Sequence, residues 1–204
     1  MVRLRILLRA RTMAASLVVL AFSFPLAVSS AADLPYDGSP SSGRSGFVVV
    51  ENTWSYRLSE KPEPAASGEW LVNWQLGYLH HLDSRSSLGG SLKVSIDPEG
   101  ERFGPVVRYR RWLDDSFGVD VEAGAYIFGS EHEAELRLPS PTFELGVTYD
   151  DWIGVQAGLD VLHREVSWEG GDHTHVEPYI GVRVGKLLTP VATIALLCFP
   201  GLVR

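Results

Sequence analysis

Strict alternation of apolar and polar side chains limits the folds open to this sequence more than any other feature. In SSLGGSLKVSID (86–97), Leu88, Leu92, Val94 and Ile96 share one face, and Ser91, Lys93 and Ser95 share the other. A period of two residues is that of a β-strand with two different faces, whereas a helix repeats every 3.6 residues. From residue 47 onward the sequence therefore predicts an all-β protein.

The alternation defines about eight strands. The segments are 47–58, 70–78, 87–96, 103–110, 117–125, 142–149, 153–161 and 176–185. The first is the weakest, because Asn52 falls on its apolar face. Long connections near 59–68, 129–140 and 165–174 alternate with short ones near 83–85, 113–115 and 150–151, and only the short connection near 98–101 breaks the scheme. This order predicts an antiparallel up-and-down β-barrel, of the kind that crosses an outer membrane.

The first 46 residues differ from the rest. Four arginines (Arg3, Arg5, Arg9 and Arg11) precede an apolar run from Met13 to Val28, and small residues follow at 29–32. This is the order of a secretory signal peptide, expected to be cleaved near Ala31 or Ala32, with an uncleaved N-terminal anchor as the alternative. Residues 33–46 are rich in Gly, Ser and Pro and predict a flexible linker before the barrel at 47–186.

The charge and the cysteine content exclude several classes of protein. Removal of residues 1–32 leaves 14 Lys and Arg against 25 Asp and Glu, a net charge of −11. Such a chain is a poor partner for nucleic acid or for an anionic membrane surface. Cys198 is the only cysteine, so the sequence offers neither an intramolecular disulfide nor a cysteine metal cluster.

Three features of the polar face indicate that it lines the lumen and that the apolar face meets lipid. Glycine is frequent there, as the narrow lumen of eight strands requires. The charges nearly balance, and charges in a confined interior must be paired. The predicted lumen network consists of Lys93, Arg108, Arg110, Asp120, Glu122, Glu144, Asp160, Glu177 and Arg183. Apolar-face aromatics gather near the strand ends: Trp70, Phe103 and Phe143 toward the long loops, and Tyr78, Tyr109, Phe117 and Tyr149 toward the short turns.

One hairpin carries this argument to individual residues. In RYRRWLDDSFGVDVEAGAY (108–126), a turn centred on Asp115 places Arg110 opposite Asp120 and Arg108 opposite Glu122. Opposite charges on neighbouring strands are favourable pairs, and arginine can bind a carboxylate through two parallel hydrogen bonds. We therefore expect two inward ion pairs; solvated surface pairs, worth about 0 to 1 kcal/mol each, are the alternative.

With its signal peptide and glycine-spaced strands, the segment FGPVVRYRRWL…SFGVDVEAGAYIFG resembles the small eight-stranded outer-membrane β-barrels of Gram-negative bacteria, the OmpA- or OmpX-like proteins. The resemblance covers about residues 47–186. It implies an exported outer-membrane protein, in contact with membrane lipid and with the barrel-assembly machinery. Members commonly end on a closing strand with a terminal aromatic residue, whereas here LLTPVATIALLCFPGLVR (187–204) follows the last strand.

That hydrophobic tail leaves three interpretations open. Its apolar stretch is marginal for a membrane-spanning helix, which needs about 20 residues, but the nine residues 191–199 suit a spanning strand. The tail is a ninth or closing strand, an amphiphilic segment lying on the membrane, or a short hydrophobic hairpin.

Candidate catalytic and metal-binding groups are weak. His163, Asp172, His173 and His175 flank the last long loop and include zinc-ligand types, but a metal site is not expected. HHLDSRS (80–86) and the His163–Ser167 spacing supply hydrolase residue types without a convincing arrangement. We expect no cofactor, no metal and no catalytic residue.

The sequence predicts a monomeric, non-enzymatic outer-membrane barrel with a charge-plugged lumen. Its role is structural, or is interaction at the cell surface with an extracellular ligand through the long loops. Two alternatives remain: an outer-membrane lipid-modifying enzyme, and a soluble periplasmic barrel of lipocalin type. The second alternative requires the apolar face to turn inward around a cavity.

Overall fold

The computed structural model describes residues 45–58, 70–98, 100–131, 135–166 and 171–185. They lie in the compact unit Pro35–Arg204. The expected signal peptide, the tail 187–204 and nearly all of the linker lie outside the described residues. The strands are β1 (Gly46–Arg57), β2 (Trp70–Asp83), β3 (Ser86–Asp97), β4 (Gly100–Trp112), β5 (Phe117–Tyr126), β6 (Phe128–Glu131), β7 (Glu135–Arg137), β8 (Ser140–Tyr149), β9 (Ile153–Val166) and β10 (Gly171–Gly185).

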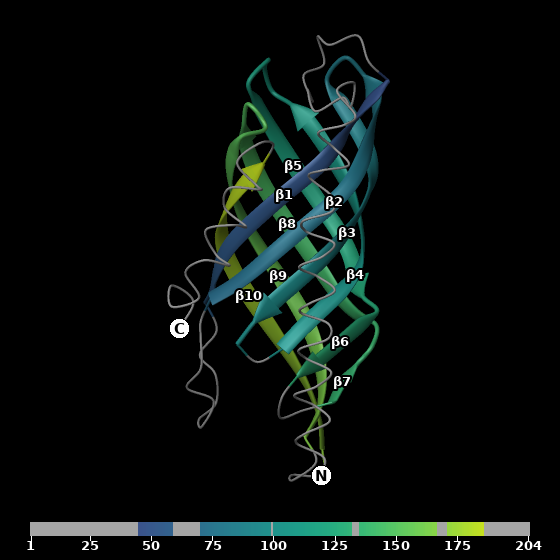
Figure 1. Cartoon of the computed structure of the whole chain (residues 1–204), viewed down its shortest axis with the longest axis vertical. Coiled ribbons are helices and arrows are strands. Elements are labelled where there is room, and N and C mark those ends of the chain that lie inside the picture. Colours follow the sequence, from purple (N-terminus) through teal and green to yellow (C-terminus); the bar gives the residue numbers. More distant parts are fainter. Residues whose placement is uncertain (1–44, 59–69, 99, 132–134, 167–170, 186–204) are drawn as a thin grey trace, which may run out of the picture. The chain divides into compact units, whose positions relative to one another are not determined.

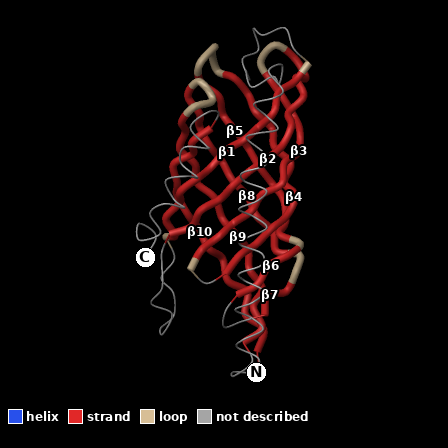
Figure 2. Tube along the Cα trace, viewed as in Figure 1, coloured by secondary structure: helices blue, strands red, loops and turns tan. Residues whose placement is uncertain are grey.

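The strands form a closed antiparallel barrel (Figures 1 and 2). Each of β1, β2, β3, β4, β5, β8, β9 and β10 pairs with its neighbour in chain order, and β10 returns to pair with β1. β6 pairs with β4 where β5 has ended, and β7 pairs with β9 beyond β8. These two short strands lengthen the wall rather than adding to the ring. The prediction of an up-and-down barrel of eight strands is confirmed, including the weak first strand.

Two connections expected to be long loops are shorter than the sequence indicated. Much of 129–140 belongs to β6, β7 and the start of β8, and β9 and β10 extend into 165–174. These segments are rich in charged residues and were therefore interpreted as loops, although the strands continue through them beyond the apolar belt. The third long connection, near 59–68, lies outside the described residues. The short turns stand where they were predicted.

Side-chain acceptors fix two of the short turns. The Asp114 carboxylate accepts hydrogen bonds from the backbone N–H groups of Phe117 at 2.7 Å and Ser116 at 2.8 Å, and these bonds lower its pKa. The Asp83 carboxylate accepts from the Ser86 hydroxyl and the Arg85 N–H, both at 2.7 Å, with the same effect on its pKa. Such local bonds offer the backbone a turn in place of a continued ladder.

The hairpin register agrees with the one worked out from the sequence. Across β4 and β5, Arg110 is the Cα partner of Asp120, and Arg108 is the partner of Glu122. All four side chains are buried. They are inward groups rather than the solvated surface pairs of the alternative.

The barrel is polar inside and apolar outside. The buried residues include Lys93 and five arginines, whereas outward residues such as Val107 (58% exposed), Leu145 (56%) and Val155 (59%) are uncovered. A lipocalin-type barrel needs the opposite arrangement, so the described strands exclude that alternative. Among the described residues, no helix is long and apolar enough to cross a membrane.

Candidate functional site in the charged lumen

At the centre of the barrel, three arginines surround one aspartate. Asp120, on β5, accepts hydrogen bonds from Arg110 at 2.6 and 2.9 Å, from Arg108 at 2.8 and 3.0 Å, and from Arg183 at 2.9 Å. β4 carries the first two arginines and β10 carries the third. All four side chains are at most 2% exposed. A buried carboxylate with this many charge-assisted donors is a strong anchor between strands.

Arg108 and Arg183 also reach other walls of the barrel. Arg108 donates to the two oxygens of Glu51, on β1, at 2.6 and 3.1 Å. Arg183 donates to Glu122 at 2.7 Å and to Gln156 at 2.9 Å. β1 and β4 are three places apart in the ring, as are β5 and β10. The contacts therefore cross the lumen rather than running only between neighbouring strands.

A second cluster lies between β3, β8 and β10. The Lys93 ammonium bonds to Glu144, to the Tyr179 hydroxyl at 3.0 Å and to the Thr142 hydroxyl at 3.2 Å. The Tyr179 hydroxyl donates in turn to Glu144 at 2.6 Å. Gly158 makes room for this ring, because a Cβ there would stand 2.5 Å from the Tyr179 Cζ. Glycine in this wall thus serves close packing inside the lumen.

A third cluster lies at the long-loop end of the lumen. Arg57 forms ion pairs with Asp97 and, at 3.1 Å, with Glu177. Arg102 pairs with the same Asp97 at 2.7 Å and with the same Glu177 at 3.5 Å. Nearby, the Tyr126 hydroxyl donates to Asp160 at 3.3 Å, and the Arg102 guanidinium lies 5.6 Å from the Tyr126 ring centroid. Four strands are joined by the Arg57–Asp97–Arg102–Glu177 group.

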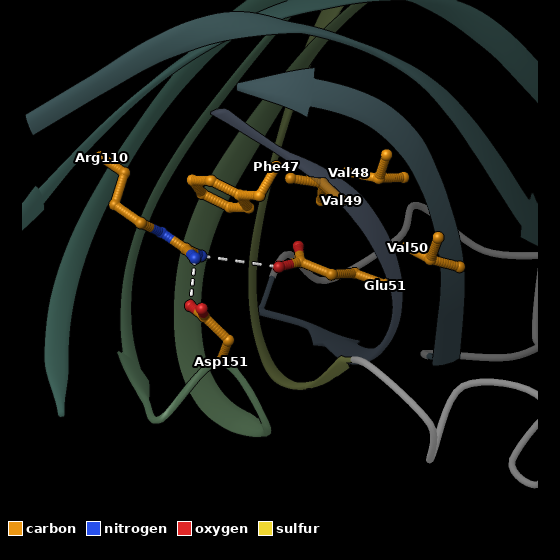
Figure 3. Close-up of a pocket in the computed structure, with 7 residues that line it drawn as sticks. All are labelled: Phe47, Val48, Val49, Val50, Glu51, Arg110 and Asp151. Carbon is orange, nitrogen blue, oxygen red and sulfur yellow. Dashed lines mark hydrogen bonds and ion pairs between the residues drawn. The ribbon is translucent and has the colours of Figure 1, made fainter. Parts of the chain in front are cut away.

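Aromatic residues close the short-turn end. The Phe47 ring packs against Trp112 at 5.8 Å and against His81 at 5.4 Å between centroids, and the Arg110 guanidinium lies 5.7 Å from the Phe47 centroid. Arg110 also bonds to Asp151, which holds a left-handed backbone conformation (φ 54°) in the β8–β9 turn. Figure 3 shows Arg110 between Asp151 and Glu51, beside Phe47, in a small open pocket lined also by Val48, Val49 and Val50.

The structure places all nine residues of the predicted network in the interior, each at most 5% exposed. The charged residues that sequence reasoning missed are Glu51, Arg57, Asp97, Arg102 and, at the rim, Asp151. Glu51 and Arg57 lie on the strand that looked weakest, and Arg102 precedes the point where β4 was expected to begin. The alternation of faces along β1 could have identified Glu51 and Arg57, because both share the inward face of this strand with Thr53.

The other candidate sites do not assemble. His175 shares the inward face of β10 with Glu177, whereas His163 lies opposite the exposed Thr174 on the outward face of β9. The two histidines are therefore on opposite faces of the barrel wall, and the side chains of Asp172 and His173 lie outside the described residues. Within the described part of the chain, no group of three metal-ligand side chains comes together. Ser87 and His81 do meet, with Oγ 2.8 Å from Nδ1. However, Ser87 is wholly buried, so its hydroxyl is inaccessible to a substrate in this conformation.

No protein-family model and no curated protein matches the sequence. Solved structures that match include a de novo designed transmembrane β-barrel, at 10% identity and a TM-score of 0.39, over 70% of this chain and 96% of that one. Another is the outer membrane protein Ail of Yersinia pestis in a phospholipid bilayer nanodisc, at 11% identity and a TM-score of 0.37, over 68% of this chain and 99% of that one. The fold of this chain is defined by its own strand pairing, and neither match assigns it an activity.

Proposed function

We propose that this protein is a monomeric integral β-barrel of a Gram-negative outer membrane, with a lumen closed by ion pairs. Its role is structural, or is the presentation of the segments between strands to an extracellular ligand, and it is neither a channel nor an enzyme. The observation that carries the proposal is the polarity of the wall, which buries arginines and exposes valine, leucine and aromatic rings.

That polarity fits hydrocarbon outside the barrel better than water. An exposed apolar patch on a soluble monomer rarely exceeds a few hundred Å², whereas here apolar side chains cover the outward face of every principal strand. Aromatic pairs stand at both ends of the belt. Tyr56 and Trp70 are 5.5 Å apart between ring centroids near the long loops, and Phe117 and Tyr149 are 5.1 Å apart near the short turns. Girdles of this kind mark the two interfaces of a membrane barrel.

The proposed closure follows from the contacts across the lumen. Eight strands enclose a space only just wide enough for side chains. Arg108 and Arg183 span it at the centre, and the Lys93–Glu144–Tyr179 cluster fills another level of it. An ion crossing the barrel would have to break several buried pairs at once, which is costly.

The proposal is tested by fractionation, gel mobility and conductance of the mature protein. We expect it in the outer-membrane fraction, with different mobilities for unheated and boiled samples on a detergent gel, because a closed barrel resists detergent until heated. In planar bilayers we expect no stepwise conductance. A soluble periplasmic protein without a mobility shift would refute the membrane placement, whereas regular current steps would refute only the closed lumen.

A further inference from the structure

Two exposed arginines are neighbours at the short-turn end of the barrel. Arg85 lies in the β2–β3 turn, and its carbonyl accepts a hydrogen bond from the Trp112 N–H at 2.8 Å. Arg111, the residue before Trp112 on β4, is the Cα partner of Ser86. Every other lysine or arginine whose side chain the structure describes is buried and ion-paired, whereas these two are exposed and form no ion pair with a described residue.

One carboxylate lies near this arginine pair, and the turn itself engages it. Asp83 accepts hydrogen bonds from the Ser86 hydroxyl and the Arg85 N–H, both at 2.7 Å. The Ser86 bond lowers the pKa of Asp83 most, and the charge of Arg111 lowers it least. This stretch of the rim therefore carries two guanidinium groups against one carboxylate, and a net positive charge is left for a ligand.

The other short turns carry the opposite charge. The β4–β5 turn contains Asp114 and Asp115, and the β8–β9 turn contains Asp150 and Asp151, with no lysine or arginine in either turn. The chain as a whole is also acidic, with a net charge of −7. Among the described residues of this end, an anion therefore meets favourable charge only on the side formed by β2, β3 and β4.

Arg111 stands where the apolar belt of the wall ends. Val107, Tyr109 and Arg111 follow one another on the outward face of β4, in the order apolar, aromatic, cationic. A strand rises about 3.4 Å per residue, so Arg111 lies about 7 Å beyond Tyr109 along the strand. Aromatic side chains mark the interface of a membrane barrel. An arginine just beyond them can lay its aliphatic stem on the wall and keep its guanidinium among the lipid headgroups.

We propose that Arg85 and Arg111 bind the phosphate of an anionic phospholipid, such as phosphatidylglycerol, in the leaflet that faces the short turns. The inference rests on the proposed function, in which those turns face the periplasm, and it adds a specific lipid partner. Guanidinium groups bind phosphate oxygens through paired, charge-assisted hydrogen bonds. The exposed Leu88, which is the Cα partner of Tyr109, continues the apolar wall on which the acyl chains lie. A zwitterionic lipid fits less well, because its own cationic group competes with the arginines for the same phosphate.

Site-specific photo-crosslinking in vesicles tests this partner. Benzoylphenylalanine replaces Tyr109, beside the arginine pair, or Phe117 as the matched control, because Phe117 is an outward aromatic residue beside the acidic Asp114 turn. The mature protein is refolded in vesicles of equal parts phosphatidylglycerol and phosphatidylcholine with identical acyl chains, and lipid adducts are identified by mass. We expect the ratio of phosphatidylglycerol to phosphatidylcholine adducts to be about fivefold higher at residue 109 than at residue 117, which is the effect of one net positive charge near an anionic lipid surface.

The double variant Arg85→Gln, Arg111→Gln should lower the ratio at residue 109 to that at residue 117. Gel mobility of the unheated variant checks that the barrel still closes, because neither arginine takes part in the described interior network. Equal ratios at the two probes with both arginines present, or a difference that survives the double substitution, would overturn the lipid assignment.

The same experiment separates this inference from the proposed function. Lipid adducts at both probes in equal ratios would leave the membrane placement standing and refute only the anionic lipid site. Absence of lipid adducts at both probes would refute the membrane placement itself. Adducts between residue 109 and a second copy of the chain would overturn the lipid assignment and make this face a contact between barrels.

Discussion

Replacement of Arg108 by methionine tests whether the lumen network holds the barrel together. Methionine keeps most of the length of the side chain but removes the guanidinium that joins Glu51 and Asp120. Asp120 keeps Arg110 and Arg183 at 2.6–2.9 Å, whereas Glu51 keeps only longer contacts, to Arg183 at 3.4 Å and Arg110 at 3.6 Å. The main cost of the substitution is therefore a buried carboxylate at Glu51 without a close partner.

Loss of one member of a buried ion pair typically costs 3–5 kcal/mol, and we expect a loss of about that size for Arg108→Met. Neutralising the stranded carboxylate in the double variant Arg108→Met, Glu51→Gln should recover about 2 kcal/mol of it. Glu122→Gln should recover nothing, because Glu122 keeps Arg183 and Gln75, each at 2.7 Å. Rescue thus separates the cross-lumen partner from the residue directly opposite in the hairpin.

The assay is a urea titration of the refolded barrel. The folded fraction at each urea concentration is measured as the share of the protein that migrates as the folded band on a gel without heating. The matched control is Arg111→Met, since Arg111 is the next residue along β4 and is exposed. Its change should stay within about 0.5 kcal/mol. Equal stability of the two methionine variants would refute the role assigned to the network. Rescue by Glu122→Gln rather than by Glu51→Gln would show that the hairpin pair dominates.

Three further predictions address the outer wall, the packing of the lumen and one turn. Val121→Arg should cost about 2–4 kcal/mol if this residue faces the bilayer midplane, and an unchanged urea midpoint would reject that orientation. Gly158→Val should destabilise by about 1–3 kcal/mol through overpacking against Tyr179, while Ala157→Val, on the outward face, should not. Asp114 has a lowered pKa in the folded state, so its contribution to stability is present above the ordinary aspartate pKa and is lost as the pH falls through the folded value. Asp114→Ala should therefore flatten the acid side of the stability profile, and an identical profile would show that the turn bonds contribute nothing.

The ring and one register could be predicted because they depend on local rules. Alternation assigns each residue to a face, and a short turn fixes the partner of every residue in its hairpin. Asp115 in the turn was enough to pair Arg110 with Asp120 and Arg108 with Glu122. The strand bounds were less certain, because charged residues at the long-loop ends resemble loop sequence even where the ladder continues.

Contacts across the lumen could not be derived in the same way. Whether Arg108 meets Glu51 depends on the stagger between β1 and β4, which lie three places apart in the ring. That stagger is the sum of the registers of the strand pairs between them, and it is fixed only when β10 pairs with β1 and the barrel closes. Asn52 added a second obstacle, because it weakened the apolar pattern of the strand that also carries Glu51 and Arg57.

In the proposed function, the side chains that stabilise this barrel are the same ones that close its lumen. A soluble domain is held by an apolar core, but here the apolar side chains face outward, and six buried cations and six buried carboxylates occupy the described interior. Removal of Arg183 would widen the lumen, but it would also leave Glu122 without its closest cation. Variants of this barrel that conduct ions should therefore be those that unfold most readily, and conductance should rise with loss of stability along a series of lumen substitutions. A stable variant with an open lumen would need its carboxylates neutralised together with its arginines.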